Sequence, residues 1–244
     1  MADIAHSLAA VEDRIAEAAG RSGREPGDVT LVAISKMFPA QAVVEAYQAG
    51  VRHFGENRVY EGLDKMARVD EVLAAPDLTW HMVGHIQSRK AEDVVGAYRV
   101  VHSVDRLKIA RYLSRYAQAA NLSLPVLLEC NVSGETSKYG FDLSRWAEEP
   151  PRRQAFREVV RKMINLPGIE LQGLMTMAPL VDDPEEARPV FASLRGLRDW
   201  LNEQLPNQEW RHLSMGMTND FEVAVEEGAT MVRVGRAVFG PREH

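Results

Sequence analysis

The segment Val29-Thr-Leu-Val-Ala-Ile-Ser35, followed directly by Lys36, gives the clearest indication of the fold. It is a short apolar run rich in β-branched residues, and turn-forming residues precede it, so it predicts a buried β-strand. Pro39 then opens a helical pattern that stops at Gly50. Proline needs no amide hydrogen in a first helical turn, and glycine adopts a left-handed turn cheaply. Strand, helix and stop together form one βα unit.

The same alternation recurs along the whole chain. An amphipathic helix from Ile4 to near Gly20 precedes it, and helical patterns at 59–72, 105–119, 152–164, 184–205 and 219–227 separate the later strands. Parallel strands need such crossovers. An open doubly wound sheet also alternates in this way, but eight strands match a closed (β/α)8 TIM barrel, which we therefore predict. The seven further strands are expected at 51–54, 79–83, 99–104, 125–131, 169–176, 210–214 and 231–234.

Length and composition suit a single barrel domain over residues 1–244, because such barrels commonly run to roughly 250 residues. The net charge of −6 argues against nonspecific nucleic-acid binding, which needs many basic side chains. Cys130 is the one cysteine, so no intramolecular disulfide forms, and we expect a buried structural thiol. Residues 1–20 carry acids and no continuous apolar stretch, so we expect no signal peptide, no membrane span and a cytoplasmic protein.

Lys36 lies where the first strand ends. In such barrels chemistry collects at the carboxyl ends of the strands, on the loops that lead into the helices. The lysine side chain is expected to point into the barrel mouth, where partial removal from water makes an amine more nucleophilic. From position alone, a lysine that merely ends a strand at the surface is an equally good interpretation.

Two glycine-containing segments follow the last two strands. One is Ser214-Met-Gly216-Met-Thr218-Asn-Asp, and the other is Arg233-Val-Gly235-Arg236. Barrels often bind phosphate at these two loops, where glycines admit close backbone approach and helix N-termini present unpaired amide hydrogens. A single glycine-rich turn is usually only a turn, but two on adjacent strands favour a phosphoryl ligand.

Other polar residues have structural and functional interpretations side by side. Asn57 suits a helix cap, and it is also placed to hydrogen-bond a ring hydroxyl. The loop Ser133 to Gly140, which contains Lys138, is expected to face the site. Ser214 follows His212 closely, but the Gly-x-Ser-x-Gly elbow of a hydrolase is absent. Five histidines show no metal-ligand spacing, so we predict no metal site and mostly structural roles for His53, His81, His85, His102 and His212.

Seven ordered blocks cover nearly the whole chain and carry a resemblance to a known family. They are Val32-Ala-Ile-Ser-Lys36, Phe54-Gly-Glu-Asn57, Trp80-His-Met-Val-Gly-His-Ile-Gln-Ser-Arg-Lys90, Asn131-Val-Ser-Gly-Glu-Thr-Ser-Lys-Tyr-Gly140, Gly173-Leu-Met175, Ser214-Met-Gly-Met-Thr-Asn-Asp220 and Met231-Val-Arg-Val-Gly235. In these blocks the sequence resembles the YggS/PROSC family of pyridoxal phosphate homeostasis proteins.

This resemblance implies a fold-type III barrel, like the N-terminal domain of alanine racemase, with pyridoxal 5′-phosphate (PLP) held on Lys36 as a Schiff base. It also implies that Arg233 faces the pyridine nitrogen. Thr218 stands where the family commonly has serine, and it keeps the hydroxyl group. The residues that the resemblance places around the cofactor phosphate are Ser214, Gly216, Thr218, Gly235 and Arg236.

The resemblance further implies a non-catalytic vitamin B6 carrier that takes part in intracellular PLP homeostasis. A PLP-dependent amino-acid racemase is the alternative, and a protein whose PLP regulates some partner is a third. Ten residues follow Val234, so we expect no second domain to close the site, an open mouth and a monomer. Apo-enzymes that use PLP are expected as transient recipients. Lys138 is a hypothetical second, transient PLP site or lid contact.

Overall fold

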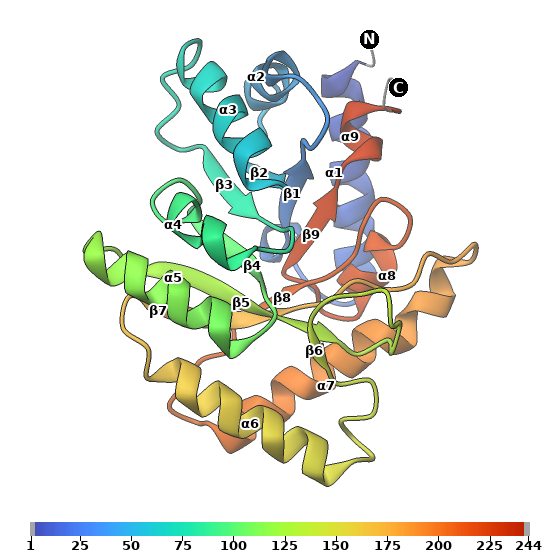
Figure 1. Ribbon diagram of the computed structural model, residues 1–244. Helices are drawn as coiled ribbons and strands as arrows, with labels where there is room; N and C mark the ends of the chain where they lie inside the picture. Colours follow the sequence, from blue (N-terminus) through green and yellow to red (C-terminus); the bar gives the residue numbers. More distant parts are fainter. Residues whose placement is uncertain (1–2, 242–244) are drawn as a thin grey trace.

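The computed structural model describes residues 3–241, which form one closed barrel (Figure 1). All strand pairs are parallel, and the pairing of the fourth strand with the fifth closes the circle. The predicted (β/α)8 TIM barrel is therefore confirmed, and an open sheet is excluded. The barrel strands are, in spatial order, β4 (Val100–Val104), β3 (Thr79–Met82), β2 (His53–Glu56), β1 (Thr30–Ile34), β9 (Met231–Val234), β8 (His212–Ser214), β7 (Ile169–Met175) and β5 (Leu124–Asn131).

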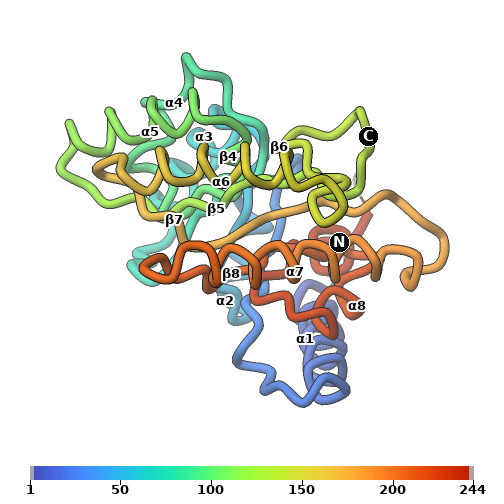
Figure 2. Tube along the Cα trace, turned by 90° about the horizontal axis from the view of Figure 1, so that it is seen from below, coloured from blue at the N-terminus to red at the C-terminus, as the bar shows by residue number. Residues whose placement is uncertain are grey.

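Helices surround this barrel on the outside. In Figure 2, α1, α7 and α8 lie on one side and α4 and α5 on the opposite side. The predicted N-terminal helix is α1, which packs against α8 and α9. The helices are α1 (Ile4–Arg21), α2 (Ala40–Gln48), α3 (Val59–Asp70), α4 (Ala91–Val94), α5 (Leu107–Ala119), α6 (Pro150–Ile164), α7 (Arg188–Gln204), α8 (Phe221–Glu226) and α9 (Arg236–Phe239).

Several elements differ from those expected from the sequence. The helix expected from residue 152 begins at Pro150, because proline is well tolerated in a first helical turn. The helix expected from 184 starts as a 3-10 turn, Pro184–Ala187, before α7. Helices α4 and α9 and the edge strand β6 (Phe141–Asp142) were not predicted, because two to four residues are too short to show a period.

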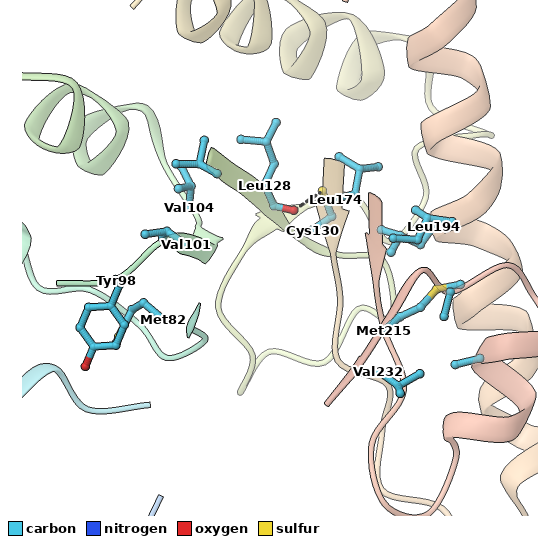
Figure 3. Close-up of a cluster of buried hydrophobic side chains, with 14 of the residues drawn as sticks. Met82, Tyr98, Val101, Val104, Leu128, Cys130, Leu174, Leu194, Met215 and Val232 are labelled. Carbon is cyan, nitrogen blue, oxygen red and sulfur yellow. Dashed lines mark hydrogen bonds between the residues drawn. The ribbon is translucent and has the colours of Figure 1, made fainter. Parts of the chain in front are cut away.

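Apolar side chains fill two regions, one on each face of the sheet. The larger region lies between the outward faces of the strands and the helices, and Leu128, Leu174, Val232 and Leu194 of α7 belong to it (Figure 3). Cys130 is buried there, as predicted. The smaller cluster joins strands on opposite sides of the barrel, so it lies inside: Val32, Ile34, Leu127, Met175 and Met231. Both faces of β1 are thus covered, which explains its continuous apolar run.

Across residues 3–241, no helix combines the length and the apolar character that crossing a bilayer requires.

Candidate functional site

The turn after β1 sets the position of Lys36. Side chains alternate along a strand, so Lys36 continues the inward row of Val32 and Ile34 toward the barrel mouth. Met37 then reverses the chain in a left-handed conformation, with φ of 66°, and its N–H donates to Oε1 of Glu61 at 2.7 Å. A non-glycine residue in this region costs roughly 1–2 kcal/mol. This strained backbone conformation therefore lies immediately next to Lys36.

A buried ion pair fixes the other side of this turn. Oε1 of Glu56 accepts from Nζ of Lys65 at 2.5 Å and from Oγ of Ser35 at 2.7 Å. The Lys65 ammonium also donates to the Ser35 carbonyl at 2.6 Å. Removal from water raises the pKa of Glu56, and Lys65 opposes that rise. The backbone just before Lys36 is therefore held by a closed network that the sequence analysis missed.

A cavity of about 480 Å³ opens at the carboxyl ends of the strands. It is lined by the strand residues Ile34, Glu129 and Arg233 and by residues of the loops after β1, β2, β3, β5, β7, β8 and β9. Six of the eight predicted site residues line it together: Lys36, Asn57, Thr218, Arg233, Gly235 and Arg236. The loops after β8 and β9 and the lysine after β1 therefore share one cavity.

The other two predicted residues, Ser214 and Gly216, lie behind the cavity wall. Gly216 has a φ of 92°, and a Cβ added there would lie 2.6 Å from that of Ala224. Only glycine fits this turn without strain. Asp220 holds the same turn, because its Oδ1 accepts from the Met217 N–H at 2.5 Å. Gly216 thus shapes the loop that presents Thr218.

Arg233 forms the floor of the cavity and is almost fully buried. Its guanidinium donates to Oγ of Ser214 at 2.6 Å and to the carbonyl of Thr176 at 2.8 Å. Burial lowers the pKa of Arg233 to about 10, and nearby Asp220 and Glu129 oppose that shift. It therefore stays a cation at neutral pH, fixed by acceptors from β8 and from the residue after β7.

Glu129 of β5 also lines the cavity, and the sequence analysis missed it. The side chain is buried, and its Oε2 has no hydrogen-bond partner in the structure. Burial raises the pKa of Glu129 to about 7, with Asp105 adding to the rise and Arg233 opposing it. A lone carboxylate inside the apolar run Val126-Leu-Leu-Glu-Cys130 was the signal that could have identified it.

Two stacked aromatic rings line the cavity near its mouth. Tyr139 stacks on His85 with ring centroids 4.0 Å apart, and both residues line the cavity. Nδ1 of His85 lies 2.8 Å from Oδ2 of Asp105. Tyr139 belongs to the loop 133–140, which therefore faces the site as predicted. Lys138 does not line the cavity, and its ammonium lies 3.9 Å from the Glu135 carboxylate.

Among residues 3–241, no group of three or more histidine, cysteine, aspartate or glutamate side chains is arranged to hold a metal ion.

Comparison with known proteins identifies relatives over the full length. The family model for the N-terminal domain of alanine racemase matches residues 6–243. A pyridoxal phosphate homeostasis protein of Pseudomonas aeruginosa is 43% identical over 100% of this chain and 98% of its own. The solved structure of PipY from Synechococcus elongatus, described as having PLP bound, is 37% identical with a TM-score of 0.80, covering 97% of this chain and 100% of its own.

A more distant comparison concerns the fold alone. The alanine racemase of Clostridium difficile is 14% identical with a TM-score of 0.69, and the match covers 98% of this chain and 56% of the racemase. The barrel is therefore shared with that enzyme. The full-length matches at higher identity decide the closer relationship: this chain belongs to the family of pyridoxal phosphate homeostasis proteins.

Proposed function

We propose that this protein binds pyridoxal 5′-phosphate through Lys36, as a Schiff base, and takes part in PLP homeostasis without a catalytic activity of its own. One observation carries the proposal: the amine of Lys36, the cation of Arg233 and the glycine loops after β8 and β9 line the same cavity. A volume of about 480 Å³ suits a small phosphorylated ring. The PLP-bound relative and the names of the homologues support it.

The residues present fit the two ends of such a cofactor. At the phosphate end we assign the Thr218 hydroxyl, the cation of Arg236 and the first-turn amides of α9, which follow Gly235. The Val238 amide already donates to the Gly235 carbonyl at 3.0 Å, so the amides assigned to the anion are those of Arg236 and Ala237. Ser214 and Gly216 are assigned a supporting role behind this loop. Asn57 is assigned to a ring hydroxyl, since its side chain borders the same cavity.

We assign Arg233 to the pyridine nitrogen of the cofactor, where its chemistry limits the reactivity of the bound ring. When bound, PLP supplies an aldehyde that amines attack and a ring that withdraws electrons from the attached carbon. Arginine only donates hydrogen bonds, so it cannot stabilise a protonated pyridine nitrogen as an aspartate would. Arg233 is buried and held by two acceptors, which keeps its N–H groups in fixed directions. This arrangement favours holding the cofactor over strong carbanion chemistry.

An exposed mouth also supports a carrier. Leu180 and Tyr139, which line the cavity, are 80% and 56% exposed. Water and incoming amines therefore reach the cavity easily, which suits release and exchange more than protected proton transfer. A racemase is the second candidate, because the barrel is shared with alanine racemase.

Two measurements test the proposal. Titration of the purified protein with PLP should produce an imine absorbance band, and the absence of that band would refute the Schiff base. Incubation of the loaded protein with D- or L-alanine in deuterated water separates the two candidate functions. We expect Cα–H exchange far below ordinary turnover rates, typically about 10 per second. Sustained exchange at such rates would establish the racemase instead.

Transfer tests the role in homeostasis. An apo-enzyme that needs PLP is mixed either with the loaded protein or with the same amount of free PLP, and both samples contain a trap for free aldehyde. We expect the loaded protein to restore enzyme activity despite the trap. Recovery no better than with free cofactor would remove the delivery role while leaving binding intact.

A further inference from the structure

Three histidines form a continuous hydrogen-bonded row through the barrel interior. Nδ1 of His53 lies 3.0 Å from Nε2 of His81, and Nδ1 of His81 lies 2.8 Å from Nε2 of His102. Nδ1 of His102 lies 2.8 Å from Oγ of Ser214, which accepts from Arg233. We name His53, His81 and His102 the histidine chain. It links β2, β3 and β4 to the cavity floor.

Such a row is unusual for this position. Barrel interiors are commonly filled with valine, isoleucine and leucine, and this barrel has such a cluster only on its other strands. His81 and His102 are almost fully buried. Burial lowers the pKa of His81 to about 3 and that of His102 well below its ordinary value, and the neighbouring histidines and Arg233 add to the shift at His102. Both rings are therefore neutral, and each has one donor and one acceptor nitrogen.

The hydrogen bond from Arg233 to Ser214 determines which nitrogen of His102 carries the proton. A guanidinium only donates, so Oγ of Ser214 accepts from it and has one proton left to give. If Nδ1 of His102 carried a proton, Ser214 would accept twice and its hydroxyl would need another acceptor in a fully buried site. Among the described residues, no hydrogen bond from Ser214 to such an acceptor is found. The hydroxyl of Ser214 therefore donates to His102.

The remaining protons follow from this first assignment. With Nδ1 of His102 as acceptor, its proton lies on Nε2 and is given to Nδ1 of His81. By the same logic His81 donates from Nε2 to Nδ1 of His53. His53 keeps an Nε2–H, and this ring is half-buried at a surface cavity lined by Thr30 and Arg52. The one donor without a partner in the row therefore lies where water reaches.

We propose that the histidine chain is a one-way row of hydrogen bonds in which all three neutral rings carry their proton on Nε2. Acting through Ser214, the row positions Arg233 at the floor of the cofactor cavity. His102 is thus a positioning residue, because it contacts Ser214 and not the cavity itself. The link to the cofactor rests on the proposed function, whereas the tautomers of the three rings do not.

The tautomers are measured in the protein without cofactor. Long-range proton–nitrogen correlation spectra of 15N-histidine-labelled protein at neutral pH distinguish a protonated Nδ1 from a protonated Nε2. We expect the Nε2–H form at His53, His81 and His102. An Nδ1–H form at His81 or His102, or a charged ring at either, would overturn the proposal whatever the protein binds.

Two substitutions at one position separate positioning from packing. In His102→Gln the amide oxygen accepts from Ser214 and the amide nitrogen donates to His81, so the direction of the row is retained. In His102→Leu both bonds are lost while an apolar side chain still fills the interior. We expect His81 to keep its Nε2–H form in the glutamine variant and to become a tautomer mixture in the leucine variant. Identical His81 spectra in the two variants would contradict the proposal.

The cofactor arm uses PLP itself as the probe. We expect the Kd for PLP to change little in His102→Gln and to rise about tenfold in His102→Leu, the effect of loosening one charged hydrogen-bond donor. Equal affinity in both variants would remove the positioning role. If the wild-type protein binds no PLP, the proposed function fails, and the apo spectra still decide the direction of the row.

Discussion

Among the individual residues, Glu129 is expected to make the stability of the protein depend on pH below neutrality. Its folded-state pKa is about 7 against an ordinary value of 4.5, so the folded protein binds more protons than the unfolded chain between these values. Its contribution to stability is therefore complete below pH 4.5 and is lost as pH rises toward 7. The loss amounts to about 3 kcal/mol at most.

Glu129→Gln removes this titration. Urea unfolding is measured for wild type and variant at roughly pH 4 and roughly pH 8. We expect the variant to gain stability relative to wild type at the higher pH and little at the lower one. Glu17→Gln, on an exposed face of α1, is the control and should show no such change. A pH-independent difference at Glu129 would mean that its carboxyl is not titrating in this range.

Among the structural elements, the turn between β1 and α2 combines a strained backbone conformation at Met37 with the site residue Lys36. Met37 is 60% exposed with a φ of 66°, so it contributes conformation more than packing. We expect Met37→Gly to match or exceed wild-type stability and Met37→Val to lose about 1–2 kcal/mol, because a β-branched side chain fits this region worst. Chemical denaturation measures both. Equal stability of the glycine and valine variants would show that no strain is stored here.

The ion pair between Glu56 of β2 and Lys65 of α3 stabilises the same turn, because both side chains hydrogen-bond to Ser35. Lys65→Met leaves the Glu56 carboxylate buried without its partner, so we expect a loss of about 3 kcal/mol or more. Adding Glu56→Gln to this variant removes the stranded charge and should restore part of the loss. Lys108→Met, on an exposed face of α5, is the matched control. If the double variant is no more stable than Lys65→Met, the pair is not the reason for the loss.

The strands and helices of the barrel could be predicted from the sequence, whereas many contacts between them could not. The continuous apolar run before Lys36 and the repeated helical patterns were enough to predict the barrel. A strand that is buried on both faces appears in the sequence as a continuous apolar run, and the crossover helices between strands show a helical period. Contacts between distant strands have no local pattern. His102 of β4 and Ser214 of β8 are 112 residues apart, so no local pattern signals their contact. Glu56 and Lys65 are only nine residues apart, but their contact depends on how α3 packs against β2, which the sequence pattern does not show.

At the scale of the whole molecule, closure of the sheet creates the candidate site. The pairing of β4 with β5 brings the ends of all eight strands to one rim, so Lys36 from the start of the chain lies with Arg236 from its end. The sequence predicted six of the residues lining the cavity. Glu129 and His85 were missed or given a structural role, because only the closed barrel shows that their side chains face the same space.

The most direct test of the account is to trap the cofactor on the protein. Loaded protein is reduced with borohydride, digested, and the peptide that carries the pyridoxyl group is identified by mass spectrometry. We predict modification at Lys36 in the wild type and in Lys138→Ala, and loss of the imine band in Lys36→Ala. A pyridoxyl group on another lysine of the wild type, or an unchanged band in Lys36→Ala, would contradict the account.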